Sequence, residues 1–513
     1  MLPWGMAVLM GVIGAYVGWQ YGAPTESQSR NLSAEVGMNI AMEAATLRTS
    51  ATQATRASAA EAWASFQARP WNHPLIPPVS FAGARSRVRA PADPQTTIAI
   101  RPSTDDATTI QQALDAAAPG TRIELAAGRF VLDRPITLRT NGVALVGAGQ
   151  ALTTIHLARP LADVQQADPR WSWSGGFLQI GQGKPDAAPA ATIGWIDTLA
   201  EEGHRRIAIA GATASYRVDQ DLILTWHGDR SLGEYLGMPT AAWNSWNYVS
   251  DGTLRVRLTN RIAAIDAGGV VLAKPLRLPI RPPWRVSVEP ADSMIRDIHV
   301  GGFTLTTARQ RWHGHLRDPG WNGIMLDGAI DVAIADITMS DVDNGIFLRN
   351  AHHCSVLRTR FIGGPCHHAI NLSGHASDNL VRGFDILCKV FHGISVQDLA
   401  SGNVFADGRM AHGTFDSHRG LPFDTVRTAI SIFNDGRPGG SANAGPYAGR
   451  RTVHWNIAIS ATPTAKVPGR WIDEPHLFPN SLLVDIAYPD RPGSRQTDAP
   501  AYADLHALQT ATR

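Results

Sequence analysis

The chain has 513 residues, which is enough for two or three average domains or for one long solenoid. Its 46 basic and 44 acidic residues almost cancel to a formal charge of +2, so no strong net field favours a nucleic acid as partner. The 48 glycines and 33 prolines are typical of a turn-rich all-β protein.

The N-terminus predicts export. Residues 3–23 contain no charged side chain, and about 20 apolar residues can cross a bilayer. Trp4 and Trp19 stand near the ends of this stretch, where aromatic residues prefer the membrane interface. Cleavage as a signal peptide is the alternative, but no Lys or Arg precedes the stretch and Pro24 follows the best cleavage position. We therefore expect residues 1–24 to tether an exported protein that is periplasmic or extracellular.

Three segments precede the most regular part of the chain. Residues 25–94 are rich in Ala, Ser and Pro and predict a spacer or stalk that is partly helical. Within 95–194, Asp105 or Asp106 can cap a helix over about 107–118, which Pro-Gly ends before short strands begin. A helix in this position would cover the open first turn of a solenoid.

The stretch TDDATTIQQALDAAAPGTRIELAAGRFVL, followed by LVGAG, resembles the opening of the pectate-lyase-like superfamily of β-helix proteins. The similarity covers roughly 105–155. It implies a right-handed parallel β-helix and a protein that acts on or binds polysaccharides, since the superfamily consists largely of hydrolases, lyases and epimerases, plus phage tailspikes.

The main repeat begins with four similar units: NGIML at Asn322, NGIFL at Asn344, HAINL at His368 and HGISV at His392. The units follow one another at 22, 24 and 24 residues. A period of this length with short strands inside each unit indicates a stacked solenoid. We predict that 291–490 forms the main β-helix and that 491–513 is a C-terminal tail.

Residues 195–290 interrupt the repeat. Their alternation of apolar and polar residues predicts a small insertion of antiparallel strands. Trp243 and Trp246 lie in it, and they would form either a sugar-binding lip or the core of the insertion. Three cysteines lie inside the main repeat, and we expect them to be buried, with a single disulfide as the alternative.

Alignment of the rungs brings polar residues into stacked columns. Asn322, Asn344, His368 and His392 form one column, with Trp321, Asp343 and His367 in the column before it. Asp416, His418 and Arg419 come from the next rung, and Asp341 precedes Asp343 by two residues. Aromatic faces and polar side chains in one groove suit a polysaccharide. Buried ladders of Asn and His side chains that only stabilise the turns are the alternative.

Hydrolysis of a glycosidic bond requires two carboxyl groups. The best pair is Asp343 and Asp416, with Asp341 as a substitute. Rungs about 4.8 Å apart would separate the backbones of the pair by about 14 Å, whereas Asp341 and Asp343 would lie closer together on one strand face.

Elimination or C5 epimerisation of a uronic acid requires a base and a cation that neutralises the carboxylate. His418 or His392 could be the base and Arg419 the cation. A metal site could use His367, His368, His392 and Asp416, but no compact spacing demands one. We expect neither a metal nor a cofactor.

Family motifs narrow the choice only a little. The N-T-D, D-D, G-H-G and R-I-K motifs of polygalacturonases are absent from the rungs, and D-S-H-R at 416–419 matches half of the D-P-H-D motif of mannuronan C5-epimerases. The segments from 415 onward loosely resemble β-helix glycoside hydrolases of the endo-D-arabinanase type, which would give importance to His418, Arg419 and Trp455.

The sequence therefore predicts an exported enzyme that cleaves a polysaccharide, with hydrolysis preferred. A lyase or uronate epimerase is the first alternative and a glycan-binding β-helix without activity the second. We expect a polysaccharide as partner, no nucleic acid, and either a monomer or a homo-oligomer.

Overall fold

The computed structural model describes the following residues: 55–85, 94–165, 175–181, 194–196, 198–210, 216–238, 249–250, 252–267, 269–434, 447–462, 472, 478, 480–488 and 502–513. The predicted anchor, Trp243 and Trp246 lie outside these ranges. None of the described helices is long and apolar enough to span a membrane.

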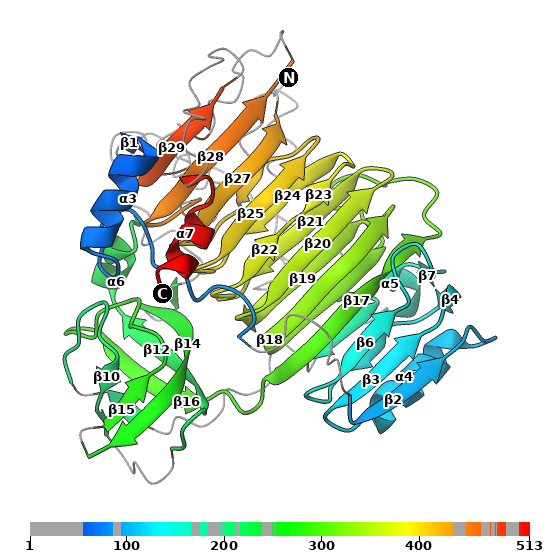
Figure 1. Cartoon of the computed structure of the whole chain (residues 1–513), viewed down its shortest axis with the longest axis horizontal. Helices are drawn as coiled ribbons and strands as arrows, with labels where there is room; N and C mark the ends of the chain where they lie inside the picture. The colour runs from blue at the N-terminus through cyan, green and yellow to red at the C-terminus, as the bar shows by residue number, and fades with distance from the viewer. Residues whose placement is uncertain are drawn as a thin grey trace, which may run out of the picture. The chain divides into compact units, whose positions relative to one another are not determined.

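Most of the described chain is a right-handed parallel β-helix whose strands stack one above another (Figure 1). The predicted fold class is therefore confirmed. Its strands are β1 (Thr55–Ala57), β2 (Thr96–Ile100), β3 (Thr121–Leu125), β4 (Gly128–Leu132), β5 (Ile136–Leu138), β6 (Ala144–Gly147), β7 (Thr153–Leu157), β8 (Leu178–Gly181), β17 (Ile295–Thr307), β18 (Asn322–Ser340), β19 (Asn344–His352), β20 (Ser355–Ile362), β21 (Cys366–Ser373), β22 (Leu380–Arg382), β23 (Asp385–Ile386), β24 (Val390–Val396), β25 (Val404–Met410), β26 (Phe415–Ser417), β27 (Val426–Phe433), β28 (Thr452–Ser460) and β29 (Ser481–Ala487).

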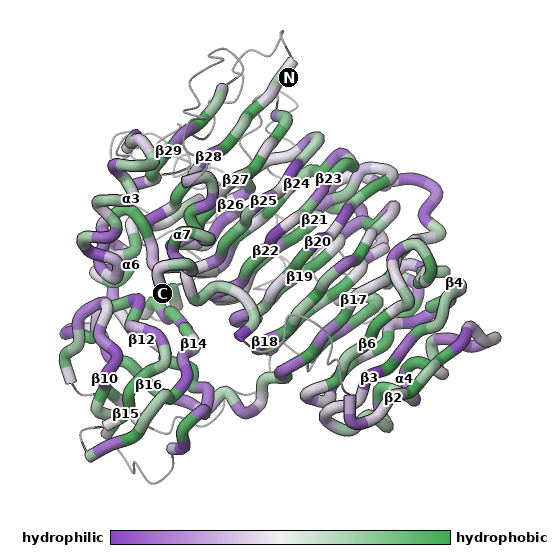
Figure 2. Tube along the Cα trace, viewed as in Figure 1, coloured by the Kyte–Doolittle hydropathy of each residue, from purple (hydrophilic) through white to green (hydrophobic). Residues whose placement is uncertain are grey.

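The repeat sets the register of this stack. Asn322 pairs with Asn344, Asn344 with His368, and His368 with His392, as the alignment of the four units predicts. Apolar positions stack in the same way and fill the inside of the coil, so hydrophobic segments recur from strand to strand (Figure 2). Cys354, Cys366 and Cys388 are all buried there as free thiols.

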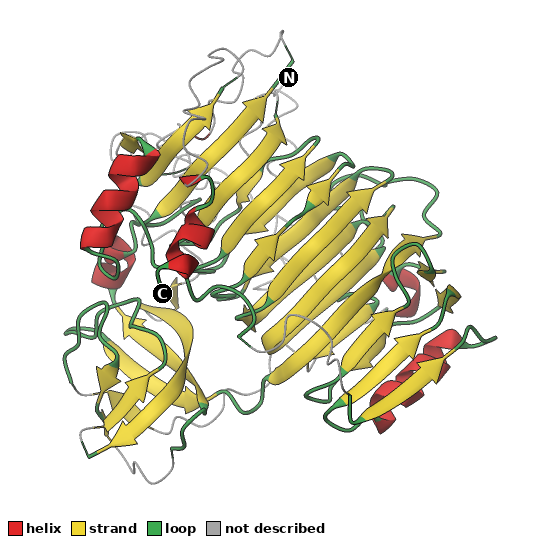
Figure 3. Cartoon of the chain, in the orientation of Figure 1, coloured by secondary structure: helices red, strands yellow, loops and turns green. Residues whose placement is uncertain are grey.

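Helices are few among the described residues (Figure 3). Helix α4 (Asp106–Ala116) occupies the predicted place, and the Asp105 side chain caps it by accepting the Thr108 N–H at 3.0 Å. Ile110 and Leu114 of this helix join the core of the first rungs. The remaining helices are α3 (Ala59–Ala68), α5 (Leu161–Val164), α6 (Arg230–Tyr235) and α7 (Leu505–Ala511).

Part of the predicted spacer packs against the β-helix. Strand β1 pairs with β29, and α3 buries Trp63 and Phe66 in a cluster that also holds Val453 and Trp455. A truncation that removes 1–70 would therefore expose apolar surface of the solenoid.

The described strands between residues 194 and 290 form the separate antiparallel sheet that the alternating pattern predicts. It consists of β9 (Gly194–Ile196), β10 (Arg206–Ile207), β11 (Ile209–Ala210), β12 (Asp221–Gly228), β13 (Val249–Ser250), β14 (Thr253–Asp266), β15 (Gly269–Leu272) and β16 (Arg285–Pro290). Its own apolar core includes Trp226 and Trp284. Buried ion pairs join this sheet to turns of the β-helix, among them Lys274 and Arg277 with Asp378.

A second ladder of amides stabilises the turns of the coil, and it gives a test of the fold. Asn379 Oδ1 accepts the Cys354 N–H at 2.8 Å, and its Nδ2 donates to Asn403 Oδ1 at 2.9 Å. Asn379 is fully buried, so water cannot replace its side chain in Asn379→Ala. The Cys354 N–H and Asn403 Oδ1 each lose a hydrogen-bond partner, and the free energy of unfolding should fall by about 1–3 kcal/mol. Asn141 also accepts a backbone N–H, that of Arg296, but is exposed.

Water can replace the lost bond in Asn141→Ala, so this control should lose less than about 1 kcal/mol. Urea unfolding followed by circular dichroism measures both variants. Equal losses would contradict a structural role for the buried amide ladder.

Candidate functional site

The side chains of the column of Asn322, Asn344, His368 and His392 are buried in the wall of the coil. Asn344 Nδ2 donates to Asn322 Oδ1 at 2.9 Å, and Asn344 Oδ1 accepts the His368 N–H at 3.2 Å. The rings of His368 and His392 stack with their centroids 4.7 Å apart. The two asparagines thus form a structural ladder of hydrogen bonds. The two histidines extend the column by ring stacking.

Two further tryptophans are also buried: Trp321, which was predicted to bind substrate, and Trp455, which the arabinanase resemblance singled out. Trp321 belongs to the main core of the β-helix. Trp455 is fully buried against α3, and its Nε1–H donates to the Tyr502 carbonyl at 2.7 Å. Neither ring has a face free for a ligand, because other apolar side chains pack against it.

One member of the predicted carboxylate pair, Asp343, is held by an arginine. Asp343 is fully buried, accepts the Trp321 N–H at 3.0 Å, and forms an ion pair with Arg309 Nη1 at 2.9 Å. Burial raises the pKa of Asp343, although the Trp321 N–H and Arg309 oppose this shift.

Asp341 does not share an extended strand face with Asp343, contrary to the expectation from sequence. It lies in a turn with φ of 59°, and its carboxylate accepts the Gly364 N–H at 2.8 Å. Its Oδ1 is 4.0 Å from Arg309 Nη2. The two carboxylates therefore flank one guanidinium, and Asp343 serves the structure of this turn.

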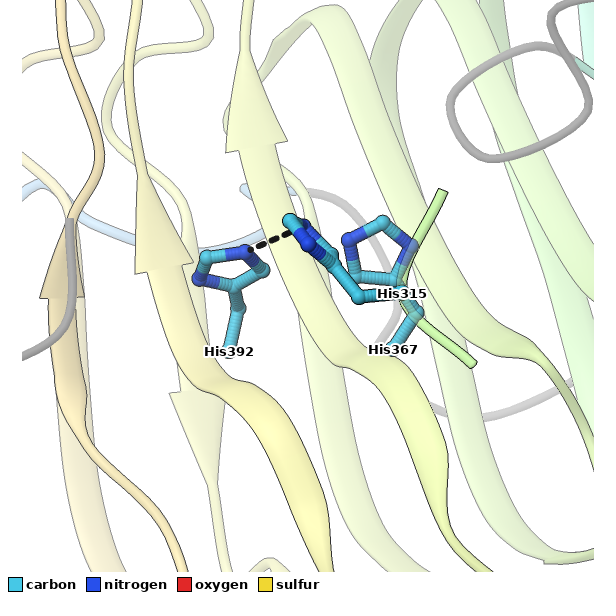
Figure 4. Close-up of side chains that lie close together, drawn as sticks. All are labelled: His315, His367 and His392. Atoms are coloured by element: carbon cyan, nitrogen blue, oxygen red, sulfur yellow. Dashed lines mark hydrogen bonds between the residues drawn. The ribbon is translucent and has the colours of Figure 1, made fainter. Parts of the chain in front are cut away.

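Three histidines, one of them His392 of the column, converge at one place (Figure 4). His367 comes from β21 and His392 from β24, while His315 comes from the loop of residues 308–321 between β17 and β18. The Nε2 atoms of His315 and His392 are 3.3 Å apart. The His315 ring also stacks on Phe391, with centroids 4.0 Å apart and planes 13° apart.

Two buried carboxylates, Asp318 and Asp416, lie beside the Nδ1 atoms of His367 and His392. Asp318 Oδ2 lies 2.8 Å from His367 Nδ1. Asp416 Oδ2 lies 3.3 Å from His392 Nδ1 and 3.3 Å from His418 Nδ1, and it accepts the Ser395 hydroxyl at 2.6 Å. One carboxylate thus orients imidazoles from two rungs.

Arginines surround Asp416 and His418. Arg419 is half-buried, and its Nη2 lies 3.0 Å from His418 Nε2. Arg427 is fully buried and donates to the Ser417 hydroxyl at 3.2 Å. Burial lowers the pKa of Arg427 to about 9, against the opposing effect of Asp416.

Burial changes the pKa values of several groups in the cluster. Burial lowers the pKa of His418 to about 4 despite Asp416, and burial together with His367 and His392 lowers the pKa of His315 to about 3. Burial opposes ionisation of Asp416, but His392 and His418 hold its pKa well below the usual value. Neutral imidazoles can accept a proton or bind a metal ion.

Sequence reasoning missed His315, Asp318 and Arg427. The first two lie in a loop outside the repeat, so no column of the alignment contains them. The local pattern H-G-H at 313–315, followed by Asp318, was the available signal. Arg427 stands in a strand that otherwise reads as apolar.

A pocket outside this cluster is lined by several polar side chains. It has a volume of about 500 Å³ and is lined by Glu202, Tyr235 and Arg450, among others. Glu202 Oε1 accepts the Tyr235 hydroxyl at 2.7 Å and pairs with Arg450 Nη2 at 2.7 Å. These polar groups satisfy one another, so the histidine cluster is the stronger candidate.

No protein-family model matches the chain, and no curated protein matches its sequence. Among solved structures, it is similar to the tailspike of Pseudomonas phage LKA1, with 14% identity over 69% of this chain and a TM-score of 0.40. It spans 56% of the length of that tailspike, and 56% of the tailspike of Acinetobacter baumannii phage AP22.

Two enzymes match the chain with identities and TM-scores in the same range as the tailspikes. A polygalacturonase from Erwinia carotovora is 11% identical over 75% of this chain and 85% of its own length, with a TM-score of 0.34. An alginate lyase from Paenibacillus is 10% identical over 76% of this chain and 99% of its own length, with a TM-score of 0.36. At these identities and TM-scores, the likeness leaves the activity of this chain open.

Proposed function

We propose that this protein is an enzyme that modifies a polysaccharide at the cluster of His392, Asp416 and His418. The observation that carries the proposal is the single buried carboxylate of Asp416, 3.3 Å from an imidazole nitrogen of each histidine. Burying an ionised carboxylate is costly, and strongly perturbed groups gathered at one place are typical of catalytic sites.

Positive charge around the cluster favours an acidic polysaccharide. Arg419 lies at its edge, and the 308–321 loop carries the exposed side chains of Arg311 and Arg317. Guanidinium groups bind carboxylates in a bidentate manner, so uronic acid residues are the substrate class that we infer. Trp312 in the same loop is half-buried and could pack against a sugar ring.

Elimination or epimerisation uses these groups best. In the free protein the Arg419 guanidinium covers His418 Nε2. A uronate carboxylate would draw the guanidinium away, and Nε2 could then take the proton from C5 of the sugar. In elimination, the electron pair forms the C4–C5 double bond, the C4–O bond breaks, and the leaving oxygen takes a proton from water. In epimerisation, C5 instead receives a proton from water on its opposite face, and His418 later returns its proton to the solvent.

Hydrolysis was the reaction preferred from the sequence, and it is now the second candidate. It requires two carboxyl groups at one point. Asp343 is paired with Arg309, and Asp416 lies beside two histidines. Of the three predicted carboxylates, only the half-exposed Asp341 is near solvent. A polysaccharide substrate agrees with the export predicted from residues 3–23. The possible homo-oligomer stays a prediction.

The test uses the full-length protein on alginate, polygalacturonate and neutral arabinan, with His418→Ala as the inactive control. We expect ultraviolet absorbance from an unsaturated uronate, or exchange of the C5 hydrogen with solvent without cleavage, on an acidic glycan only. New reducing ends without absorbance would instead establish hydrolysis. Retention of the protein by a glycan without any reaction would overturn the enzyme and leave a binding protein.

A further inference from the structure

The geometry of His315, His367 and His392 has a feature that proton transfer does not use. Each of the three rings offers one nitrogen that lies within 4.8 Å of the other two. The Nε2 atoms of His315 and His392 are 3.3 Å apart. Two nitrogens bound to one tetrahedral zinc ion at about 2.0–2.1 Å are separated by about 3.3–3.4 Å. This pair therefore already has the spacing of two ligands on one ion.

The carboxylates behind the rings determine which nitrogens face the cluster. Asp318 lies 2.8 Å from His367 Nδ1, and Asp416 lies 3.3 Å from His392 Nδ1. A carboxylate at Nδ1 favours the proton on that nitrogen, which leaves the lone pair on Nε2. Histidines that bind metals almost always donate their other N–H to a carboxylate, a carbonyl or water in this way.

The surrounding structure holds the three ligands in place. His367 and His392 lie on neighbouring rungs of the β-helix, β21 and β24. His315 is fixed by its stacking on Phe391, and its loop is anchored where Trp312 Nε1–H donates to Asp318 Oδ1 at 2.9 Å. Burial of all three ligand rings, two of them nearly complete, also limits competition from water.

We propose that His315, His367 and His392 bind one divalent transition-metal ion, for which zinc is the best fit. Three imidazoles are the ligand set of a zinc site that keeps a fourth position for water or substrate. Asp318 and Asp416 act as positioning residues for the ligands. The proposal goes beyond the polysaccharide chemistry, since the ion can bind whether or not a glycan reacts, and it replaces the expectation from sequence that no metal is needed.

A neighbouring set, His392 with Asp416 and His418, is also compact enough to hold an ion. We favour the first set because Asp416 lies beside the Nδ1 atoms of two rings and Arg419 covers His418 Nε2. An ion bound by Asp416 would also leave His315 and its loop without a role. The two sets differ in His315 and His418, so single substitutions separate them.

The test measures metal binding directly. The full-length protein is stripped with a chelator, and Zn²⁺ is titrated against a chromophoric competitor, with bound metal counted by mass spectrometry. We expect one equivalent per chain. His315→Ala should weaken the affinity by at least about 100-fold and Asp318→Asn by about 10–100-fold. His313→Ala, an exposed histidine in the same loop, should bind as the wild type does.

Co²⁺ gives a second readout, because its visible spectrum reports the ligand set. We expect tetrahedral bands in the wild type and in His418→Ala, and their loss in His315→Ala. Uptake below one equivalent, or equal affinities for His315→Ala and His313→Ala, would overturn the site. Loss in His418→Ala instead would move the ion to the other set. Circular dichroism of each variant excludes unfolding as the cause, and none of these measurements depends on glycan activity.

Discussion

Replacing His418 by alanine is expected to lower the turnover of the polysaccharide reaction by about 10²–10⁴-fold, the usual contribution of a general base. His418 is the imidazole that Asp416 orients through Nδ1 and that presents Nε2 next to Arg419. The variant still contains Arg419 and the 308–321 loop, so KM should change much less than kcat. Both constants are measured on the acidic glycan that the wild type modifies.

His412→Ala is the matched control. This histidine precedes His418 by six residues, lies just after the end of β25, and is exposed. Its activity should equal that of the wild type. A loss of less than tenfold in His418→Ala, with normal folding, would remove His418 from the reaction. An increase in KM alone would assign it to substrate binding.

Replacing Asp424 by alanine is expected to lower the free energy of unfolding by about 3–5 kcal/mol, the cost of breaking a buried ion pair on one side. Arg451 donates to Asp424 through Nε and Nη2, both at 2.6 Å, and Arg277 Nη1 donates to it at 3.1 Å. Asp424 and Arg451 are fully buried. Without the carboxylate, the guanidinium of Arg451 loses its bidentate partner inside the protein.

The pair of Asp336 and Arg358 is a close geometric control. Arg358 also donates through Nε and Nη2, both at 2.7 Å, but about half of each side chain is exposed. Asp336→Ala should therefore cost less than about 1 kcal/mol. Urea unfolding measures both variants, with probes in the insertion and in the solenoid because a solenoid can unfold in steps. Equal costs would show that burial does not set the strength of these pairs.

The pH dependence of the Asp424 effect has a definite sign. Burial raises the pKa of this carboxyl, but Arg451, Arg450 and Arg277 more than offset it and hold the pKa below its usual value. A lowered pKa in the folded state contributes stability above the pKa of the unfolded chain, about 3.9, and this contribution is lost as the pH falls through the folded value. The difference between wild type and Asp424→Ala should thus be largest near neutral pH and shrink in acid.

The sequence by itself determined the coil and its register. Units such as NGIFL and HAINL recur at nearly constant spacing, and a parallel β-helix pairs equivalent positions of successive units. Asn344 therefore had to pair with His368, and His368 with His392, as observed. The helix at 106–116 was equally predictable, because an aspartate cap and an apolar face are local features.

The tertiary structure decided which polar residues form the site. Alignment of the repeat predicts only which backbone positions are neighbours. The burial of each polar side chain and its hydrogen-bond or ion-pair partners depend on segments outside the repeat. Arg309 and the 308–321 loop determine that Asp343 is a buried structural carboxylate and that His315 and Asp318 reach His392 and His367. The sheet of residues 194–290 likewise supplies the cations that neutralise buried aspartates in the turns. Loops and insertions carry no period, so their contacts follow from packing in three dimensions and not from the spacing of residues along the chain.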